Sequence, residues 1–415
     1  MRAARELFLC AGTLLLLSGC AGFLAIEDLS KLEVERADSI LLVVENGVYP
    51  AVSDSIDIYR EDLEKEGCVV RCALWHGGGV EELRALLRTS AAGGAVDGAF
   101  LVGNLPAAWY EQPGFTVREE FPCDVYLMDV DARWHDRDGN GILDAHSPIS
   151  LDLFVSRVAG TGAEIARYFE KAHLYRAGQL AVWKGAYIFK DDDWADFRRG
   201  SSFELSRIYG GVEVCEDIAE SSRSAYVEKL SVTGAEYVYQ WIHSYPPLLC
   251  IKGSTGYEYI HTSDFESINL KGVFYNLFDC SAARFTEDNL GDAYLLRTDR
   301  GLAVMGSTKV GGNYYPKVFH YALSEGARWG DAFNCWYNEY GATDDKWFMG
   351  MVILGDPMLA LTEDARFELK ALTEDVPPPS REEIASLEEI MRIFEYENTC
   401  LGFEEYRSRN PRFFE

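Results

Sequence analysis

Two apolar stretches of this chain end in reactive side chains: AEYVYQWIH at residues 235–243 and GVFYNLFDC at residues 272–280. Both are rich in the aromatic and β-branched residues that favour β-strands. If they form adjacent parallel strands, their carboxyl ends meet at one edge of the sheet, which is where open α/β sheets bind ligands. His243 and Cys280 would then form a base and a nucleophile, the pair that thiolate attack requires.

The rest of the chain alternates strand-like and helical patterns. Apolar runs predict strands at 39–44, 68–74, 98–103 and 151–158, and amphipathic periodicity predicts helices at 52–66, 81–88 and 163–177. A second set of elements opens at 185–189 and closes at 352–357. This alternation predicts an α/β fold with mostly parallel sheets and right-handed crossovers. The length of 415 residues indicates either two domains or one large composite sheet.

The N-terminus has the features of an export signal. Arg2 and Arg5 precede an apolar run at 7–17, and Leu17-Ser18-Gly19-Cys20 follows. These last four residues resemble a bacterial lipoprotein box. We therefore predict a lipoprotein signal peptide at 1–19, a lipid on Cys20, a polar tether at 20–37, and a membrane-anchored protein that faces the periplasm or the cell exterior. The alternatives are an ordinary secretory signal or a short membrane anchor, although the run is short for a membrane span.

The chain is strongly acidic, with 39 Lys and Arg against 67 Asp and Glu and a formal charge of −28. Such a surface repels nucleic acid and anionic lipid headgroups, so we expect no nucleic-acid partner and membrane contact through the lipid anchor only. It is compatible with divalent cations. The Gly-rich stretches at 77–79 and 311–312 lack the Lys-Ser/Thr of a phosphate loop, and we expect no organic cofactor.

One acidic loop has the spacing of a calcium site. Potential oxygen ligands fall at alternate positions of an EF-hand-like loop, with a glycine at its sharp turn: Asp136, Asp138, Asn140, the Ile142 carbonyl and Asp144, with Gly141. Ser147 replaces the bidentate Glu of an EF-hand, so the missing ligand must come from elsewhere, with Asp129 and Asp131 as candidates. We predict a structural calcium ion here, and the alternative is a solvated acidic turn.

Four local motifs occur in order along the chain. They are Ser156-Arg157-Val158, the run 237–243 ending in His243, the run 274–281 around Cys280, and the turn Leu354-Gly355-Asp356-Pro357. From about residue 38 to 361 this set resembles the gingipain-type cysteine peptidases of the caspase-like group. The resemblance implies two stacked caspase-like α/β subdomains, at 38–180 and 181–365, with the catalytic pair in the second.

The resemblance also implies a cysteine endopeptidase that hydrolyses a peptide or protein substrate. Cys280, partly exposed, would attack the peptide carbonyl, and His243 would take up the thiol proton. The backbone amides of Ser244 and Cys280 would bind the oxyanion. The family has Gly after the catalytic His; Ser244 keeps the amide but disfavours some backbone angles open to Gly. The alternative is a non-catalytic surface lipoprotein that reuses the fold for binding or assembly.

Four acids near the predicted sheet edge are candidates for supporting roles. Asp191, Asp192 and Asp193 follow the strand at 185–189, and Asp279 directly precedes Cys280. One of them would orient His243, bind a cation or form a pocket for a basic substrate side chain. The alternative is that they cap a helix or face solvent.

We predict an acidic, helical C-terminal extension at 366–415. An apolar stripe at helical spacing runs through it: Ile384, Leu387, Ile390, Met391 and Phe394. A stripe of this kind is usually buried along one face of the helix. We expect it to dock on the body of the protein rather than to bind a partner.

Overall fold

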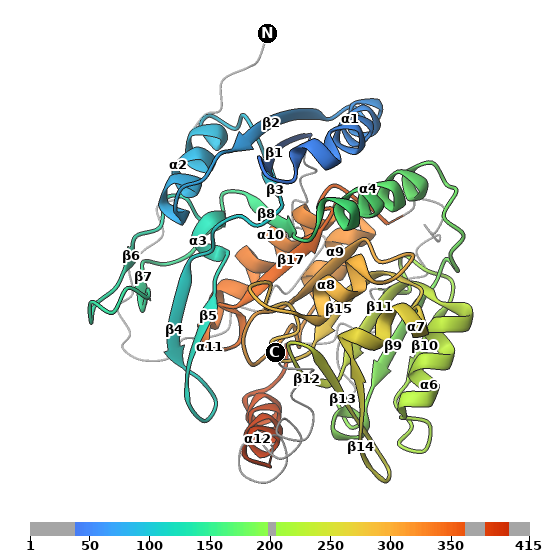
Figure 1. The fold of residues 1–415 in the computed structure, drawn as a ribbon. Helices are drawn as coiled ribbons and strands as arrows, with labels where there is room; N and C mark the ends of the chain where they lie inside the picture. Colours follow the sequence, from blue (N-terminus) through green and yellow to red (C-terminus); the bar gives the residue numbers. More distant parts are fainter. Residues whose placement is uncertain (1–37, 198–204, 362–377, 398–415) are drawn as a thin grey trace.

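A computed structural model describes residues 38–197, 205–361 and 378–397. The predicted signal peptide, the tether and Cys20 lie outside these residues. As predicted, the described chain is an α/β protein, built on a ten-stranded, mostly parallel sheet in the order β10-β9-β11-β15-β16-β17-β8-β3-β1-β2 (Figure 1). Its strands are β1 (Ser39–Glu45), β2 (Val69–Trp75), β3 (Gly98–Val102), β8 (Phe154–Val158), β9 (Ala186–Lys190), β10 (Val212–Cys215), β11 (Ala235–Trp241), β15 (Gly272–Phe278), β16 (Ala303–Ser307) and β17 (Met351–Gly355).

Helices pack around this sheet, and small antiparallel sheets extend from it. The described α-helices are α1 (Tyr49–Lys65), α2 (Val80–Ala91), α3 (Val125–Met128), α4 (Gly162–Arg176), α6 (Arg223–Glu228), α7 (Phe265–Ile268), α8 (Leu290–Leu296), α9 (Lys317–Ser324), α10 (Trp329–Glu339), α11 (Asp345–Phe348) and α12 (Arg381–Glu397). The small sheets are β4 (Trp109–Pro113) with β5 (Arg118–Pro122), β6 (Trp134–His135) with β7 (Ala145–His146), and β12 (His243–Tyr245) with β13 (Leu248–Gly253) and β14 (Gly256–His261). None of the helices described here is long and apolar enough to cross a membrane.

Local sequence explains the first strand–helix unit. Residues 40–44 of β1 are all apolar and buried, as expected for an inner strand of a parallel sheet. Helix α1 has Pro50 in its first turn, and it buries residues spaced three to four apart: Val52, Ile56, Tyr59 and Leu63. Gly67 follows with a φ of 85°, a left-handed conformation that ends helices and that Gly adopts without strain.

The sheet consists of two halves with the same strand order. From the centre outward, the first half runs β8-β3-β1-β2 and the second runs β15-β11-β9-β10. In the centre, β16 is parallel to β15 and β17 is parallel to β8, but β16 and β17 are antiparallel to each other. The carboxyl ends of the two halves therefore lie at opposite edges of one sheet.

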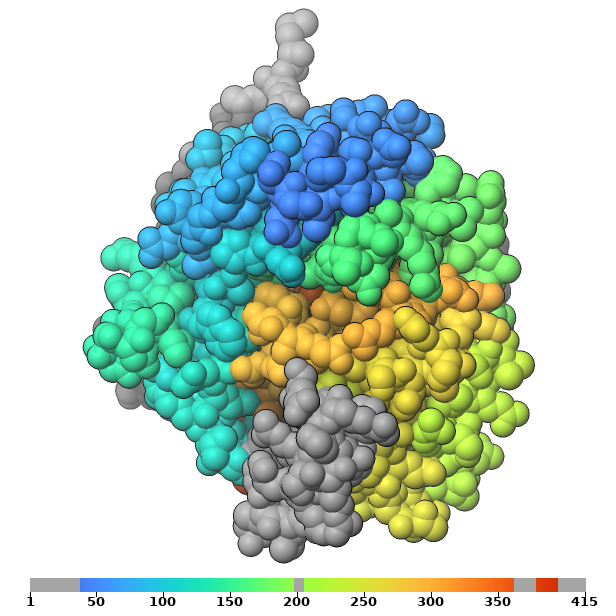
Figure 2. Space-filling view, in the orientation of Figure 1, coloured from blue at the N-terminus to red at the C-terminus, as the bar shows by residue number. Residues whose placement is uncertain are grey.

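Buried polar contacts join the two halves. The carboxylate of Asp356, which follows β17, accepts hydrogen bonds from the Tyr59 hydroxyl at 2.7 Å and from Arg176 at 2.6 Å. Figure 2 shows the blue and cyan segments of the first half adjoining the orange segments of the second. Strands from both sides of the predicted boundary at residues 180–181 belong to one continuous sheet. Of the two arrangements that the chain length allowed, the structure therefore has the large composite sheet. The division into two subdomains stays a prediction.

Candidate active site

Strands β11 and β15 are adjacent and parallel, as the two quoted stretches predicted. Their last paired residues, Trp241 and Phe278, lie opposite each other. His243 and Cys280 each follow two residues later, so both reach the carboxyl edge of the second half. The β11 strand ends before His243, which instead opens β12, because the chain turns there into the hairpin sheet β12–β14.

Hydrogen bonds tie the two strand ends together. The Ser244 hydroxyl donates to the Cys280 carbonyl oxygen at 2.7 Å, and the Ile242 amide donates to Asp279 Oδ1 at 3.2 Å. The side-chain amide of Gln240 also donates to Asp279. Asp279 is buried, and this burial raises the pKa of its carboxyl well above the usual value. Asp279 therefore fixes the backbone below the nucleophile and does not line an open pocket.

His243 is oriented by Asp193. Its Nε2 atom lies 2.9 Å from Asp193 Oδ2, and the Tyr257 hydroxyl donates to the same oxygen at 3.0 Å. Burial alone would raise the pKa of Asp193, but the contacts with His243 and Tyr257 and the charge of Lys252 hold it below the usual value. A charged carboxylate at Nε2 fixes the orientation of the imidazole ring.

A short turn after β9 positions Asp193. This turn is η2 (Asp192–Trp194), and Asp191 caps it by accepting a hydrogen bond from the Asp193 amide at 3.2 Å. The other carboxylate oxygen of Asp191 accepts the Lys252 amide at 3.0 Å, and burial raises the pKa of Asp191. Asp192 is half-buried. Of the four predicted acids, Asp193 contacts His243, while Asp191 and Asp279 hold the surrounding backbone.

The backbone is strained directly after Cys280. Ser281 has a φ of 56°, in the left-handed region that residues other than Gly rarely adopt. Its amide donates to the Lys309 carbonyl at 2.8 Å, and the Ala283 amide donates to Ser307, so the chain turns back along β16. Strained backbone concentrates at functional sites. The sharp turn places Cys280 at the tip of its strand.

Helix α12 covers both reactive side chains. The Phe394 ring stacks on the His243 imidazole, with centroids 4.0 Å apart and planes 5° from parallel. Met391 Sδ lies 3.5 Å from Cys280 Sγ. As expected, the apolar stripe of the extension docks on the body. The prediction that Cys280 is partly exposed was wrong: Cys280 is 4% exposed and His243 is 0% exposed, because side chains of α12 lie against both.

Three carboxylates come together beside the predicted calcium loop. One oxygen each from Glu111, Asp138 and Asp144 lies within 4.8 Å of the others. Hard, charged oxygens at this spacing fit the ligand shell of calcium. The side-chain amide of Asn140 donates to Glu111 at 3.0 Å and therefore lies beside the group. Glu111 is also paired with Arg118, at 2.6 Å.

Two of the other candidate calcium ligands, Asp136 and Asp129, accept backbone hydrogen bonds. The Asp136 carboxylate turns into the loop and accepts hydrogen bonds from the backbone amides of residues 139, 140 and 141. Asp129, a candidate for the missing ligand, accepts the amides of Ala132 and Ser150. The additional carboxylate is Glu111, which lies on β4, in a hairpin far from the loop in the sequence.

The equivalent edge of the first half carries a different set of residues. Val102 and Val158, the last residues of β3 and β8, lie opposite each other, and two positions later stand Asn104 and Gly160. Register therefore matches Asn104 to His243 and Gly160 to Cys280. No residue at these two positions can serve as a base or as a nucleophile.

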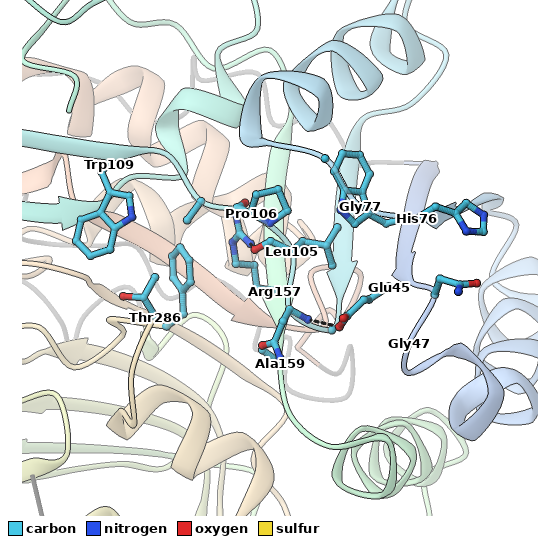
Figure 3. Close-up of a pocket in the computed structure, with 17 residues that line it drawn as sticks. Glu45, Gly47, His76, Gly77, Leu105, Pro106, Trp109, Arg157, Ala159 and Thr286 are labelled. Carbon is cyan, nitrogen blue, oxygen red and sulfur yellow. Dashed lines mark hydrogen bonds between the residues drawn. The ribbon is translucent and has the colours of Figure 1, made fainter. Parts of the chain in front are cut away.

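This first edge is hollowed by a cavity of about 670 Å³ (Figure 3). Trp109 and Thr286 lie at one end of the cavity, and Glu45 and His76 lie at the other. In its wall, Arg157 donates to both carboxylate oxygens of Asp124, at 2.6 and 2.7 Å. The Ser156-Arg157-Val158 motif thus supports the fold.

Sequence patterns did not identify three of the residues that shape these sites. Tyr257 and Glu111 lie on strands of small hairpins, where no motif distinguishes them from other strand residues. Phe394 was noted as part of an apolar stripe, but spacing along a helix does not reveal what the helix covers. Comparison with models of known protein families and with curated proteins found no match. Function is therefore inferred from the site itself.

Proposed function

We propose that this protein is an exported, lipid-anchored cysteine endopeptidase of the gingipain type. The observation that carries the proposal is the Asp193–His243 pair at the same sheet edge as Cys280. A carboxylate that orients an imidazole, at the same sheet edge as a thiol, fits the arrangement that activates a cysteine nucleophile. The lipoprotein-like run at residues 17–20 supports export and lipidation of Cys20.

In the proposed reaction, Cys280 Sγ attacks the peptide carbonyl carbon while its proton passes to His243 Nδ1. The carbon–nitrogen bond then breaks, and the imidazolium returns the proton to the leaving amine, so that a thioester remains on Cys280. A water molecule, deprotonated by His243, hydrolyses the thioester and restores the thiol. Asp193 stabilises the imidazolium at each stage by its charge and its bond to Nε2.

The oxyanion would be held by the backbone amides of Ser244 and Cys280. The Ser244 hydroxyl donates to the Cys280 carbonyl, which holds the two residues in register. The family has Gly at the position of Ser244. The hydrogen bond supports the proposal that the backbone amides of Ser244 and Cys280 stay close to each other despite this replacement.

A non-catalytic binding lipoprotein is the second candidate. Two observations favour it: Ser244 replaces Gly after the histidine, and α12 buries the Cys280 thiol and the His243 ring. A chain that never uses this pair gains stability by burying it, because free cysteines pack as small apolar residues.

We also propose a structural calcium ion at Glu111, Asp138 and Asp144. The ion would neutralise three converging carboxylates and tie the acidic loop to the β4–β5 hairpin. Its contribution is to stability, and the reaction at Cys280 does not require it.

A thiol-reactive peptide probe tests the peptidase. The full-length protein and its Phe394→Ala variant are treated with a peptidyl acyloxymethyl ketone, and the adduct is located by peptide mass spectrometry. We expect an adduct on Cys280 that is lost in His243→Ala, and cleavage of a denatured protein substrate that is lost in Cys280→Ala. Exposed Cys72 reports non-specific alkylation. The binding lipoprotein would be favoured if, in both proteins, the probe labels Cys280 no faster than Cys72 and the substrate is not cleaved.

A further inference from the structure

We propose that α12 is an intramolecular inhibitor: it occupies the cleft over His243 and Cys280 and moves away when a substrate binds. This inference rests on the proposed function and adds to it the regulation of that same site. The carrying observations are the two direct contacts of α12 with the reactive pair, Phe394 on the imidazole and Met391 on the thiol.

These contacts come from one face of the helix. Leu387, Met391 and Phe394 are spaced four and three residues apart, which aligns them on one side of an α-helix. They are 2%, 1% and 3% exposed, whereas Ile393 on the same helix is 48% exposed. The helix is thus oriented so that its apolar side chains point at the catalytic edge, with Phe394 also beside Tyr245 and Tyr257.

The docked helix and a bound substrate exclude each other. A peptide carbonyl has to come to about 3–3.5 Å from the attacking sulfur before reaction. Met391 Sδ already lies 3.5 Å from Cys280 Sγ. Phe394 covers one face of the His243 ring, so a scissile peptide cannot approach there either. Catalysis by this pair therefore requires α12 to leave.

The attachment of α12 is confined to one face of the helix. Phe394 belongs to a small apolar cluster with Leu248 and Cys250, whereas Leu387 and Met391 join the main core. One polar link to the body is an ion pair at 2.9 Å between Glu388 and Lys346, whose side chains are 20% and 35% exposed. A cavity of about 560 Å³ lies between the start of the helix and the wall that contains Trp241. A helix held by one face at the end of the described chain can open locally without global unfolding.

Alkylation of Cys280 tests the inference independently of peptide hydrolysis. The full-length protein is treated with iodoacetamide, and peptide mass spectrometry gives the labelling rate of Cys280 relative to exposed Cys72. We expect slow labelling of Cys280 in the wild type and an increase of about a hundredfold in Phe394→Ala, because a buried aromatic side chain is lost from the closed state only. Ile393→Ala is the matched control, and its ratio should stay within about twofold of wild type.

A second variant guards against misfolding. Glu388→Lys places three cations together, at positions 346, 388 and 392, and it should also speed Cys280 labelling while circular dichroism of the body stays unchanged. Wild-type Cys280 labelled as fast as Cys72, or no change in either variant, overturns the inhibitor. Faster labelling together with faster cleavage of a denatured protein supports both proposals. Faster labelling without cleavage in any variant supports α12 as a displaceable cover and overturns the peptidase.

Discussion

The two halves of the sheet share one strand order. They differ in the residues that stand two positions beyond the ends of their two inner strands. In the second half those positions hold His243 and Cys280, while the first half has Asn104 and Gly160. The first edge is an open cavity, and the second is closed by α12. Both topologies create a crevice at the strand ends. The difference teaches that topology supplies the place, whereas two side chains per half decide the chemistry.

The largest expected effect separates Cys280 from a buried cysteine elsewhere in the fold. In the Phe394→Ala background, Cys280→Ala should lower kcat/KM for peptide hydrolysis by at least about 10⁴-fold, because the nucleophile is lost. The matched control is Cys123→Ala, which removes a buried thiol that donates to the Met349 carbonyl. It should cost about 1–2 kcal/mol in urea unfolding and leave hydrolysis intact. The reverse pattern would make Cys280 a packing residue.

The next prediction concerns the acid that distinguishes the second edge. Asp193→Asn should lower kcat by about 10²- to 10⁴-fold, because the imidazole loses its orienting charge. Asp192→Asn, in the same turn, is the control and should change kcat little. Equal losses from both variants would remove Asp193 from the proposed mechanism.

Stability against pH gives Asp193 an independent readout. Its pKa in the folded protein lies below the usual value, so its carboxylate stabilises the fold fully above the unfolded pKa of about 4. The stability difference between wild type and Asp193→Asn should therefore disappear as pH falls through the lower folded pKa. Urea unfolding at several pH values measures this difference.

Loss of a buried ion pair in the first half should lower the stability of the fold without lowering peptide hydrolysis. Arg157 is 3% exposed and binds Asp124 through two hydrogen bonds. Arg157→Ala leaves a buried carboxylate without its cation and should cost about 3–5 kcal/mol of unfolding free energy. Arg60→Ala, which breaks an exposed ion pair with Asp57, is the control and should barely change it. Hydrolysis lost in Arg157→Ala at temperatures where it stays folded would place the first half in the catalytic machinery.

Calcium tests a region that belongs to the first half alone. With calcium at about a hundred times its Kd, the ion should add about 2.7 kcal/mol to the unfolding free energy, and chelation should lower the melting temperature. Asp138→Asn should remove this response, and Asp131→Asn, outside the carboxylate group, should keep it. Differential scanning calorimetry measures both. If calcium changes the melting temperature of none of these proteins, the loop is a solvated acidic turn and not a calcium site.

The last prediction compares the same capping device in the two halves. Hydrogen bonds from Thr161 hold the pKa of Glu164 below its usual value at the start of α4, whereas burial raises the pKa of Asp292 to about 7 at the start of α8. Relative to Asp292→Asn, wild-type stability should fall as pH rises from about 4 through 7, because the folded state binds the proton more tightly. Relative to Glu164→Gln, it should fall as the pH decreases below about 4. If the stability differences of the two variants from wild type change with pH in the same direction, the pKa values of Glu164 and Asp292 are not shifted in opposite directions.

Much of the α/β architecture was readable from the sequence. Buried strands such as 40–44 and 272–278 are continuous apolar runs, and local periodicity and Gly67 define α1, so these elements carry their signal within a few residues. The pairing of β11 with β15 followed from the same local signals and from the rule that consecutive strands of α/β units lie side by side. The position of His243 and Cys280 at one edge of the sheet was therefore predicted from the chain alone.

Only the tertiary structure decided which segments far apart in the chain contact each other. Asp193 was one of four plausible acids until the structure showed that a turn after β9 brings it to His243. Glu111 joined the acidic loop from a separate hairpin, and Phe394 reached His243 from 151 residues away. Local patterns encode which face of an element is apolar, because that depends on near neighbours. Which surface meets that face depends on how all elements pack together, and no short stretch of sequence carries that information.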